Sequence, residues 1–190
     1  SFVGLANLVD SLQVIKEEVY GKNMSLADLK KILDADFKDN EPLRLKFLNH
    51  YPKYGTDCNN VDSEISQIMD YIVKECSKYK MKPDDSHFIP GTFCWIMHQQ
   101  YGEKCGATPD GRRAGFPFAD GAGPAQGREK LGPTAAVNSV TSWDHSPMIG
   151  GSAFNMKFNK SLFDSPEASK KLKELILVFL RKGGFETQVN

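Results

Sequence analysis

The chain contains 190 residues, enough for one domain with a buried core. Its 24 basic and 24 acidic residues give a formal net charge of zero without any block of like charge, which argues against nucleic acid or acidic membrane surfaces as partners. Neither a long apolar run nor the basic start of a signal peptide is present, so we expect a cytoplasmic protein without a membrane span.

Residues 1–82 have the apolar spacing of helices. The first stripe ends before Gly21 and consists of Leu8, Leu12, Ile15 and Val19. Ser25 and Asp28 resemble a capping box at the start of a second helix, and Pro42 suits the first turn of a third. The longest helix is expected at about 61–79, with a stripe of Val61, Ile65, Ile68, Ile72 and Cys76. These stripes predict core packing and require no ligand.

After Lys82 the hydrophobic period becomes shorter. Residues 87–97, HFIPGTFCWIM, predict a short strand or an irregular buried segment. Residues 152–159 alternate, and one face carries Phe154, Met156 and Phe158. A helix is expected at about 165–182, and residues 185–190, FETQVN, alternate again. Strand, helix and strand at this spacing predict a right-handed crossover between parallel strands, and therefore an α/β fold.

Glycine and proline concentrate in residues 102–151, which hold ten of the 16 glycines and five of the ten prolines. Glycines at 111 and 115 suit tight turns with positive φ, and the charged side chains of the run can form charge-assisted hydrogen bonds. A phosphate-binding loop is the alternative, but the run contains no G-x-x-x-x-G-K-[ST] pattern. We predict a structural anchor made of Asp110, Gly111, Arg112, Arg113, Gly115, Asp120 and Arg128.

The cysteines and one histidine are the remaining candidates for chemistry. The four cysteines at 58, 76, 94 and 105 form no C-x-x-C pair, so we expect reduced thiols and no metal site. The adjacent Asp144 and His145 have the residue types of an acid/base pair. A loop histidine held by a neighbouring group is the structural alternative, and it is the interpretation that we favour.

Four blocks in order resemble the glycyl radical enzymes, the family of pyruvate formate-lyase and the glycyl radical dehydratases. They are PKYGTDCNNVD at 52–62, the glycine-rich run from GATPDGRRAG to GPTAAVNS at 106–139, GGSAFNMKFNKSLF at 150–163 and GGFETQVN at 183–190. Thr56 departs from the pattern, since asparagine is usual there. The resemblance covers essentially the whole chain.

The resemblance implies an interior segment, toward the C-terminal end, of a ten-stranded β/α barrel surrounded by helices. Residues 1–82 would belong to the outer helical layer, and residues 83–190 would supply the glycine-rich connection and a strand–helix–strand unit. The two parts would form one domain fragment rather than independent domains. The family also implies a glycyl radical installed by an S-adenosylmethionine iron–sulfur activating enzyme, a homodimer and a small-molecule substrate in an anaerobic organism.

Glycyl radical enzymes bring together a cysteine loop and a glycine loop, and we expect neither loop within this chain. No cysteine is followed two residues later by glutamate, as it is in most members other than formate-lyases. The sequence RKGGF at 181–185 faintly resembles the glycine loop, but it follows a long helix and opens an alternating strand. We therefore assign no catalytic residue to the chain and expect it to bind no cofactor by itself, with the remainder of the polypeptide as its partner.

The last expected strand is the candidate contact with substrate. Its alternation places Phe185, Thr187 and Val189 on one face. In the family, small apolar residues of this strand approach the substrate, so the resemblance implies that Thr187 and Val189 line the pocket. Packing of Val189 against the surrounding helices is the alternative.

The resemblance leads to one principal function and two alternatives. The first is a lyase or dehydratase that removes water or another group from a small hydroxylated substrate after hydrogen abstraction by a thiyl radical. The second is a formate-lyase type of acyltransferase that cleaves a carbon–carbon bond. The third is a non-catalytic binding or assembly subunit.

Overall fold

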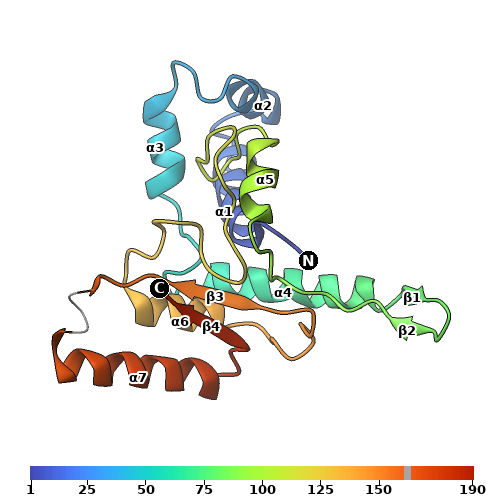
Figure 1. Cartoon of the computed structure of the whole chain (residues 1–190). Helices are drawn as coiled ribbons and strands as arrows, with labels where there is room; N and C mark the ends of the chain where they lie inside the picture. Colours follow the sequence, from blue (N-terminus) through green and yellow to red (C-terminus); the bar gives the residue numbers. More distant parts are fainter. Residues whose placement is uncertain (161–163) are drawn as a thin grey trace.

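The computed structural model describes residues 1–160 and 164–190 (Figure 1). The last three residues of the block at 150–163 therefore lie outside the described part. The elements in chain order are α1 Leu5–Ile15, the π-helix η1 Lys16–Tyr20, α2 Leu26–Asp34, α3 Glu41–Asn49, α4 Asn59–Cys76, β1 Lys80–Met81, β2 Ser86–His87, α5 Met97–Glu103, α6 Pro133–Val140, β3 Ala153–Met156, α7 Pro166–Arg181 and β4 Glu186–Val189.

The helix starts of the first part follow the capping signals in the sequence. The side chain of Ser25 accepts a hydrogen bond from the N–H of Asp28 at the start of α2. Pro42 lies in the first turn of α3, where its missing N–H leaves no helical bond unmade. The stripe predicted on the first helix is wrong at Leu8, which is 45% exposed, because α1 buries the row through Leu5 and Val9 instead.

Two hydrophobic clusters hold the chain together. The smaller one joins α1, α2 and α3 and consists of Val14, Leu29, Phe37, Phe47 and Tyr51. The larger one combines side chains from α1, α4, α6, β3 and α7, including Val9, Ile65, Val137, Phe154 and Phe179. Since the larger cluster draws on residues from both sides of position 82, the helical part and the later part share one core.

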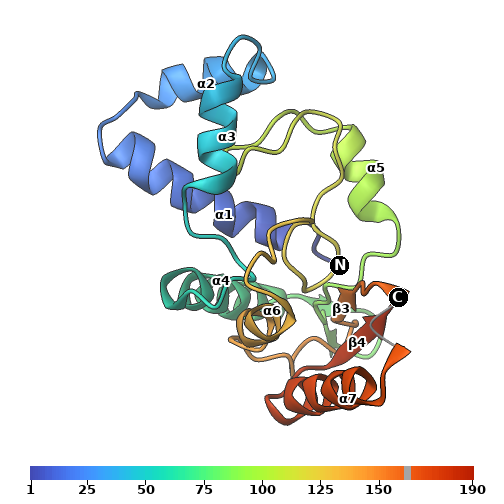
Figure 2. The same ribbon diagram turned by 90° about the vertical axis from the view of Figure 1, so that its left-hand side faces the viewer.

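The second part contains the expected pair of parallel strands. β3 and β4 pair in parallel, with Phe154 opposite Thr187 and Met156 opposite Val189. Helix α7 connects them and packs against α6 on the same side of the pair (Figures 1 and 2). The side chain of Ser165 caps the start of α7, and Gly183, with φ of 89°, ends it.

Residues 80–103 differ from the sequence-based expectation. β1 and β2 form a short antiparallel hairpin that projects beyond the end of α4 (Figure 1). The segment after the hairpin is irregular, with Thr92 and Cys94 buried but Phe88 and Trp95 exposed. It runs beside the start of β3, where the N–H groups of Thr92 and Phe93 donate to the Gly151 carbonyl. The short helix α5 follows without a periodic apolar signal in the sequence.

Among the described residues, none of the helices combines the length and the apolar character that a bilayer span requires.

Candidate functional site

Asp110 fastens the glycine-rich run to α1. Its carboxylate is fully buried, with Asn7 Nδ2 donating to Oδ2 at 2.7 Å and the Thr108 hydroxyl donating to Oδ1 at 2.5 Å. The N–H of Asp110 donates to Ser11 Oγ at 3.2 Å. Asn7 also accepts the N–H of Ala119 at 2.7 Å, so one side chain of α1 holds two points of the run. The burial of the carboxylate is thus compensated by neutral donors.

Arg112 closes the loop that follows Asp110. Its guanidinium donates to the carbonyls of Gly106, Arg113 and Phe116 at 2.5, 3.1 and 2.5 Å. The same group lies over the ring of Phe118, with 4.1 Å between the guanidinium carbon and the ring centroid. A planar cation that meets several carbonyls at once can hold a segment that lacks a regular backbone ladder.

Arg113 connects the run to the second and third helices. Its Nη2 lies 2.6 Å from Glu41 Oε2 in α3, and its Nη1 donates to the Asp36 carbonyl at 3.1 Å. Arg44 of α3 pairs with the same Glu41 and donates to the Gly111 carbonyl at 3.1 Å. Both side chains of the Arg113–Glu41 pair are more than one-third exposed, so solvent weakens their attraction. The pair therefore also matters because it fixes the position of the run against α3.

Two turns of the run require glycine to different degrees. Gly111 has φ of +91°, and a Cβ there would lie 3.0 Å from Leu48 Cδ1 and 3.1 Å from the Arg44 carbonyl oxygen. Gly115 has φ of +76°, but a Cβ would meet no atom within 4 Å. Conformation alone therefore favours glycine at 115, whereas conformation and close packing both favour it at 111.

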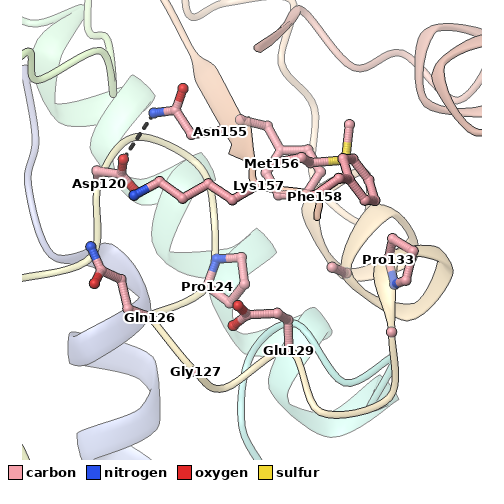
Figure 3. Close-up of a pocket in the computed structure, with 13 residues that line it drawn as sticks. Asp120, Pro124, Gln126, Gly127, Glu129, Pro133, Asn155, Met156, Lys157 and Phe158 are labelled. Carbon is pink, nitrogen blue, oxygen red and sulfur yellow. Dashed lines mark hydrogen bonds between the residues drawn. The ribbon is translucent and has the colours of Figure 1, made fainter. Parts of the chain in front are cut away.

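A cavity of about 450 Å³ lies between the run and β3 (Figure 3). On one side Asp120 Oδ2 accepts a hydrogen bond from Asn155 Nδ2 at 2.8 Å, which ties the run to β3. Apolar side chains, among them Pro124 and Phe158, make up much of the remaining wall. The volume suits a small organic molecule; the lining contains no cysteine, serine or histidine, and its ionisable side chains are Asp120, Glu129 and Lys157.

Arg128 differs from the other predicted anchor residues. No hydrogen bond or ion pair joins its side chain to any described residue, and its Nε is buried without a partner. Its closest electrostatic neighbours are Asp10 and Lys53. Arg113, Asp110 and Asp120 thus have partners on other elements, Arg112 has partners within the run, and no hydrogen bond or ion pair joins the side chain of Arg128 to the described residues.

The polar centre beneath the run is a buried pair of opposite charges. Asp10 of α1 is fully buried and Lys53 is 5% exposed, yet they form no ion pair within 4.0 Å. Burial raises the pKa of Asp10 to about 7, against the opposing effect of Lys53, and burial likewise lowers the pKa of Lys53. Asp10 Oδ1 accepts the N–H of Tyr54 at 2.8 Å, while Oδ2 and the Lys53 ammonium have no partner.

His145 is buried and bonded through both ring nitrogens. Nε2 lies 2.7 Å from the Val140 carbonyl, so it carries the hydrogen, and Nδ1 accepts the N–H of Phe185 at 3.3 Å. The ring stacks on Trp143 at a centroid distance of 3.8 Å, and burial lowers the pKa of the imidazole. His145 therefore links α6 to the start of β4 as a neutral group. The adjacent Asp144 bonds to Ser146 instead.

Thr187 and Val189 lie opposite Phe154 and Met156 in the parallel pair. Side chains opposite each other in such a pair share one face. The Phe154 ring contacts the ring of Phe179 in α7 at a centroid distance of 5.8 Å, so this face is turned toward the helix. Thr187 Oγ1 donates to the Phe154 carbonyl at 3.0 Å. Thr187 is half-buried and Val189 is 37% exposed, and Phe154 and Met156 on the same face also line the cavity of about 450 Å³, so the pocket role of Thr187 and Val189 stays a prediction.

The glycines of RKGGF have structural roles at the end of α7. The N–H groups of Gly183 and Gly184 donate to the carbonyls of Leu180 and Phe179 at 3.1 and 3.0 Å. A Cβ on Gly184 would lie 2.3 Å from the Phe179 ring. These contacts account for both glycines through helix termination and close packing, without a radical function.

The described residues contain no metal-binding group of three or more His, Cys, Asp or Glu side chains. All four cysteines are free, and Cys76 and Cys94 are buried. Cys94 Sγ accepts the N–H of Gly121 at 3.4 Å and lies 3.7 Å from His98 Nδ1. The same Nδ1 also contacts the Trp95 carbonyl at 3.1 Å, so it bears the hydrogen and offers no base to the thiol.

Sequence reasoning missed Asn7, Asp10 and Lys53 as the polar support of the run. Asp10 interrupts an apolar helix face, and Lys53 belongs to the block PKYG, so both carried a local signal. Asn7 had none, because its two partners lie 103 and 112 residues away in sequence.

Comparison with known families gives two matches that together cover most of the chain. The family described as pyruvate formate lyase-like matches residues 1–102, and the family described as glycine radical matches residues 118–190. The first of these matches extends over more than half of the chain.

Individual relatives agree with these matches. A probable dehydratase of Escherichia coli is 32% identical over 99% of this chain and 24% of its own length. An isethionate sulfite-lyase of Bilophila wadsworthia is 32% identical over 92% of the chain and 21% of its own length. The glycerol-bound B12-independent glycerol dehydratase of Clostridium butyricum superposes with a TM-score of 0.92 and 37% identity, over 99% of the chain and 24% of that structure. The chain thus spans about a quarter of the length of these relatives.

Proposed function

This chain belongs to the pyruvate formate lyase-like family of glycyl radical enzymes, and we propose that it is one interior part of an eliminating enzyme of that family. The fold agrees with this assignment, since the chain superposes on a glycyl radical dehydratase barrel over nearly its whole length. The proposed reaction removes water or another group from a small hydroxylated substrate.

The likeness to the glycerol dehydratase, at 37% identity and a TM-score of 0.92, carries this proposal. Among the relatives, one is named as a probable dehydratase, one as a lyase that removes sulfite, and the superposed structure is a glycerol dehydratase. These names have in common the removal of a group, water or sulfite. The chemistry shared by the relatives therefore supports elimination.

Within such an enzyme this chain would provide structure rather than reacting atoms. The glycyl radical would supply a thiyl radical that abstracts hydrogen from substrate. The residues of this chain would hold two neighbouring strands of the barrel wall, β3 and β4, in register. Asp110 and Asp120 would fix the glycine-rich run against α1 and β3, so that the wall keeps its shape and excludes water.

The partners follow from the family. We propose that the remainder of the polypeptide supplies the cysteine and glycine loops, that a separate S-adenosylmethionine iron–sulfur enzyme installs the radical, and that the protein works as a homodimer in the cytoplasm of an anaerobic organism. Because the chain spans about a quarter of its relatives, these contacts concern the whole enzyme.

One specific observation supports each of two other functions. The match to the pyruvate formate lyase-like family fits an acyltransferase as well as an eliminase. The other function is a non-catalytic binding or assembly subunit. It agrees with the sequence, in which no cysteine is followed two residues later by glutamate.

The test is a substrate panel with the complete polypeptide that carries this chain. The protein would be activated under argon, its radical content measured by electron paramagnetic resonance, and its products followed for glycerol, propane-1,2-diol, trans-4-hydroxy-L-proline, isethionate, and pyruvate with coenzyme A. We expect a dehydration or elimination product from one of the first four.

Formation of acetyl-coenzyme A and formate alone would replace the eliminase by the acyltransferase. A complete polypeptide that ends at Asn190 and gains no radical signal would favour the assembly subunit. Both outcomes contradict the proposed function.

A further inference from the structure

A second cavity, of about 290 Å³, lies where the glycine-rich run crosses α1 and α3. It is separate from the cavity in Figure 3 and has a different chemistry. Its charged and amide side chains include Arg44, Arg112, Arg113, Arg128, Asp110 and Gln126. Four guanidinium groups therefore surround a space that contains one carboxylate, and the question is which of them is available to a ligand.

Three of the four arginines have partners within the chain. Arg44 donates to both oxygens of Glu41 at 2.9 and 2.7 Å and to the Gly111 carbonyl. Arg113 shares the same Glu41. Arg112 is held by three backbone carbonyls. These guanidinium groups form the frame of the cavity and have little capacity for another acceptor.

Arg128 is the exception. Its side chain has no hydrogen bond or ion pair with any residue that the structure describes, and its Nε is buried. Lys53 lies near enough to interact with it electrostatically, is 5% exposed, and also has no partner for its ammonium group. The Nε of Arg128 and the ammonium group of Lys53 are thus both buried without an acceptor, and a buried polar group without a partner carries a desolvation penalty that an oxyanion on Arg128 would lower.

The carboxylates nearby do not supply that acceptor. Both oxygens of Asp110 already accept hydrogen bonds, from Asn7 and Thr108. Asp10 accepts the Tyr54 N–H through Oδ1, and neither carboxylate lies within 4.0 Å of an Arg128 nitrogen. The planar, five-donor fork of a guanidinium matches a carboxylate or a phosphate better than it matches a single water molecule.

We infer that this cavity is an oxyanion site in which Arg128 binds a carboxylate or phosphate group, while the buried Lys53, which does not line the cavity, adds to the positive potential beside Arg128. The ligand has one of two sources: a free small anion, or an acidic side chain of the polypeptide beyond the described residues. The inference does not depend on the reaction proposed above, because it concerns residues of α1, α3 and the glycine-rich run to which that proposal gives no reacting atom.

The first measurement is thermal unfolding of the complete polypeptide with sodium phosphate or sodium acetate, at constant ionic strength set by sodium chloride. An anion at about ten times its Kd contributes about 1.4 kcal/mol, which in a polypeptide about four times as long as this chain should raise the melting temperature by roughly 1 °C. The shift should disappear in Arg128→Gln. It should remain in Arg181→Gln, the matched control, since Arg181 is an exposed arginine at the end of α7 and lines no described cavity.

The second measurement is a crystal structure of the same polypeptide grown without added oxyanions. If a side chain is the ligand, phosphate and acetate will not shift the melting temperature, and an Asp or Glu oxygen will lie within about 3 Å of the Arg128 guanidinium. The inference is overturned if the anion shift is the same in Arg128→Gln, or if no shift occurs and the guanidinium contacts only water or backbone carbonyls.

Discussion

At the scale of single residues, Asp10 and Lys53 stand out as opposite charges that are buried together without touching. The Asp10 pKa of about 7 lies above its ordinary value of 3.8, chiefly because of burial. A carboxyl whose pKa is raised by folding disfavours the folded state increasingly as pH rises from about 4 to about 7, and by a constant amount above that. This pair therefore lowers stability at neutral pH.

Because the ionised carboxylate of Asp10 lowers stability at neutral pH, Asp10→Asn gives a testable prediction. Asparagine keeps the oxygen that accepts the Tyr54 N–H but carries no charge. We expect the free energy of unfolding of the variant, relative to the parent, to increase between about pH 4.5 and pH 7 and to level off at pH 8. Urea unfolding at three pH values measures it. Asp34→Asn, at an exposed carboxylate, is the control, and a pH-independent difference for Asp10→Asn would contradict the assignment.

His145 gives a second prediction at this scale. Because it is bonded as a neutral group and contacts only protein, we expect His145→Gln in the complete enzyme to change kcat by less than about tenfold, whereas general acid or base groups contribute about 10² to 10⁴. A steady-state assay with radical content measured in parallel decides this. A thousandfold loss at unchanged melting temperature would place His145 in the reaction.

The pH dependence of the free energy of unfolding gives a further test of His145. Burial lowers its pKa, so the unfolded chain binds a proton below about pH 6.5 that the folded chain does not, and stability falls as pH decreases through that range. The decrease attributable to His145 should be absent in His145→Gln. Parallel pH profiles of the two proteins would show that the imidazole is not held neutral.

At the scale of elements, the turns of the glycine-rich run make a graded prediction. Gly111→Ala and Gly115→Ala should each lower the free energy of unfolding by about 1 kcal/mol from positive φ, and Gly111→Ala should cost more because Leu48 and the Arg44 carbonyl are close. Gly106→Ala is the control, since it has neither positive φ nor a near neighbour. Chemical denaturation ranks the three, and equal effects at 106 and 111 would refute the turn argument.

The face of β4 gives the other prediction at this scale. Val189 shares a face with Met156 and with Phe154, which contacts α7, whereas Gln188 points the opposite way. We expect Val189→Phe to lower the melting temperature of the complete enzyme at unchanged KM, and Gln188→Phe to change KM. A raised KM for Val189→Phe with intact radical content would support the pocket role that the family resemblance implies for Thr187 and Val189.

At the scale of the whole molecule, we predict that the chain carries no radical centre of its own. Gly183 and Gly184 are explained by the end of α7 and by the ring of Phe179. The 190-residue chain, incubated with an activating enzyme and S-adenosylmethionine, should therefore show no glycyl doublet in electron paramagnetic resonance. The complete polypeptide is the positive control. A doublet that disappears in Gly183→Ala or in Gly184→Ala would overturn this interpretation.

Much of the architecture was predictable because its signals are local. The capping residues Ser25 and Pro42, the alternation around Phe154 and the glycines after α7 act on their immediate neighbours in sequence. Three features were not predicted: the β1–β2 hairpin, helix α5 and helix α6. Short elements with exposed or small residues leave little periodic signal in the sequence. The exposed Leu8 shows that an apolar stripe does not by itself identify the buried face of a helix.

The sequence by itself determined the α/β pattern, the parallel strand pair and the family, because hydrophobic period, caps and ordered motifs are properties of neighbouring residues. Only the tertiary structure decided which polar groups meet. Asn7 reaches Asp110 across 103 residues, Asp120 reaches Asn155 across 35, and Arg128 reaches no described partner. Such contacts depend on how the helices and the run pack, and no local pattern encodes them. The register of β4 on β3, which places Thr187 opposite Phe154 and Val189 opposite Met156, is likewise a tertiary feature.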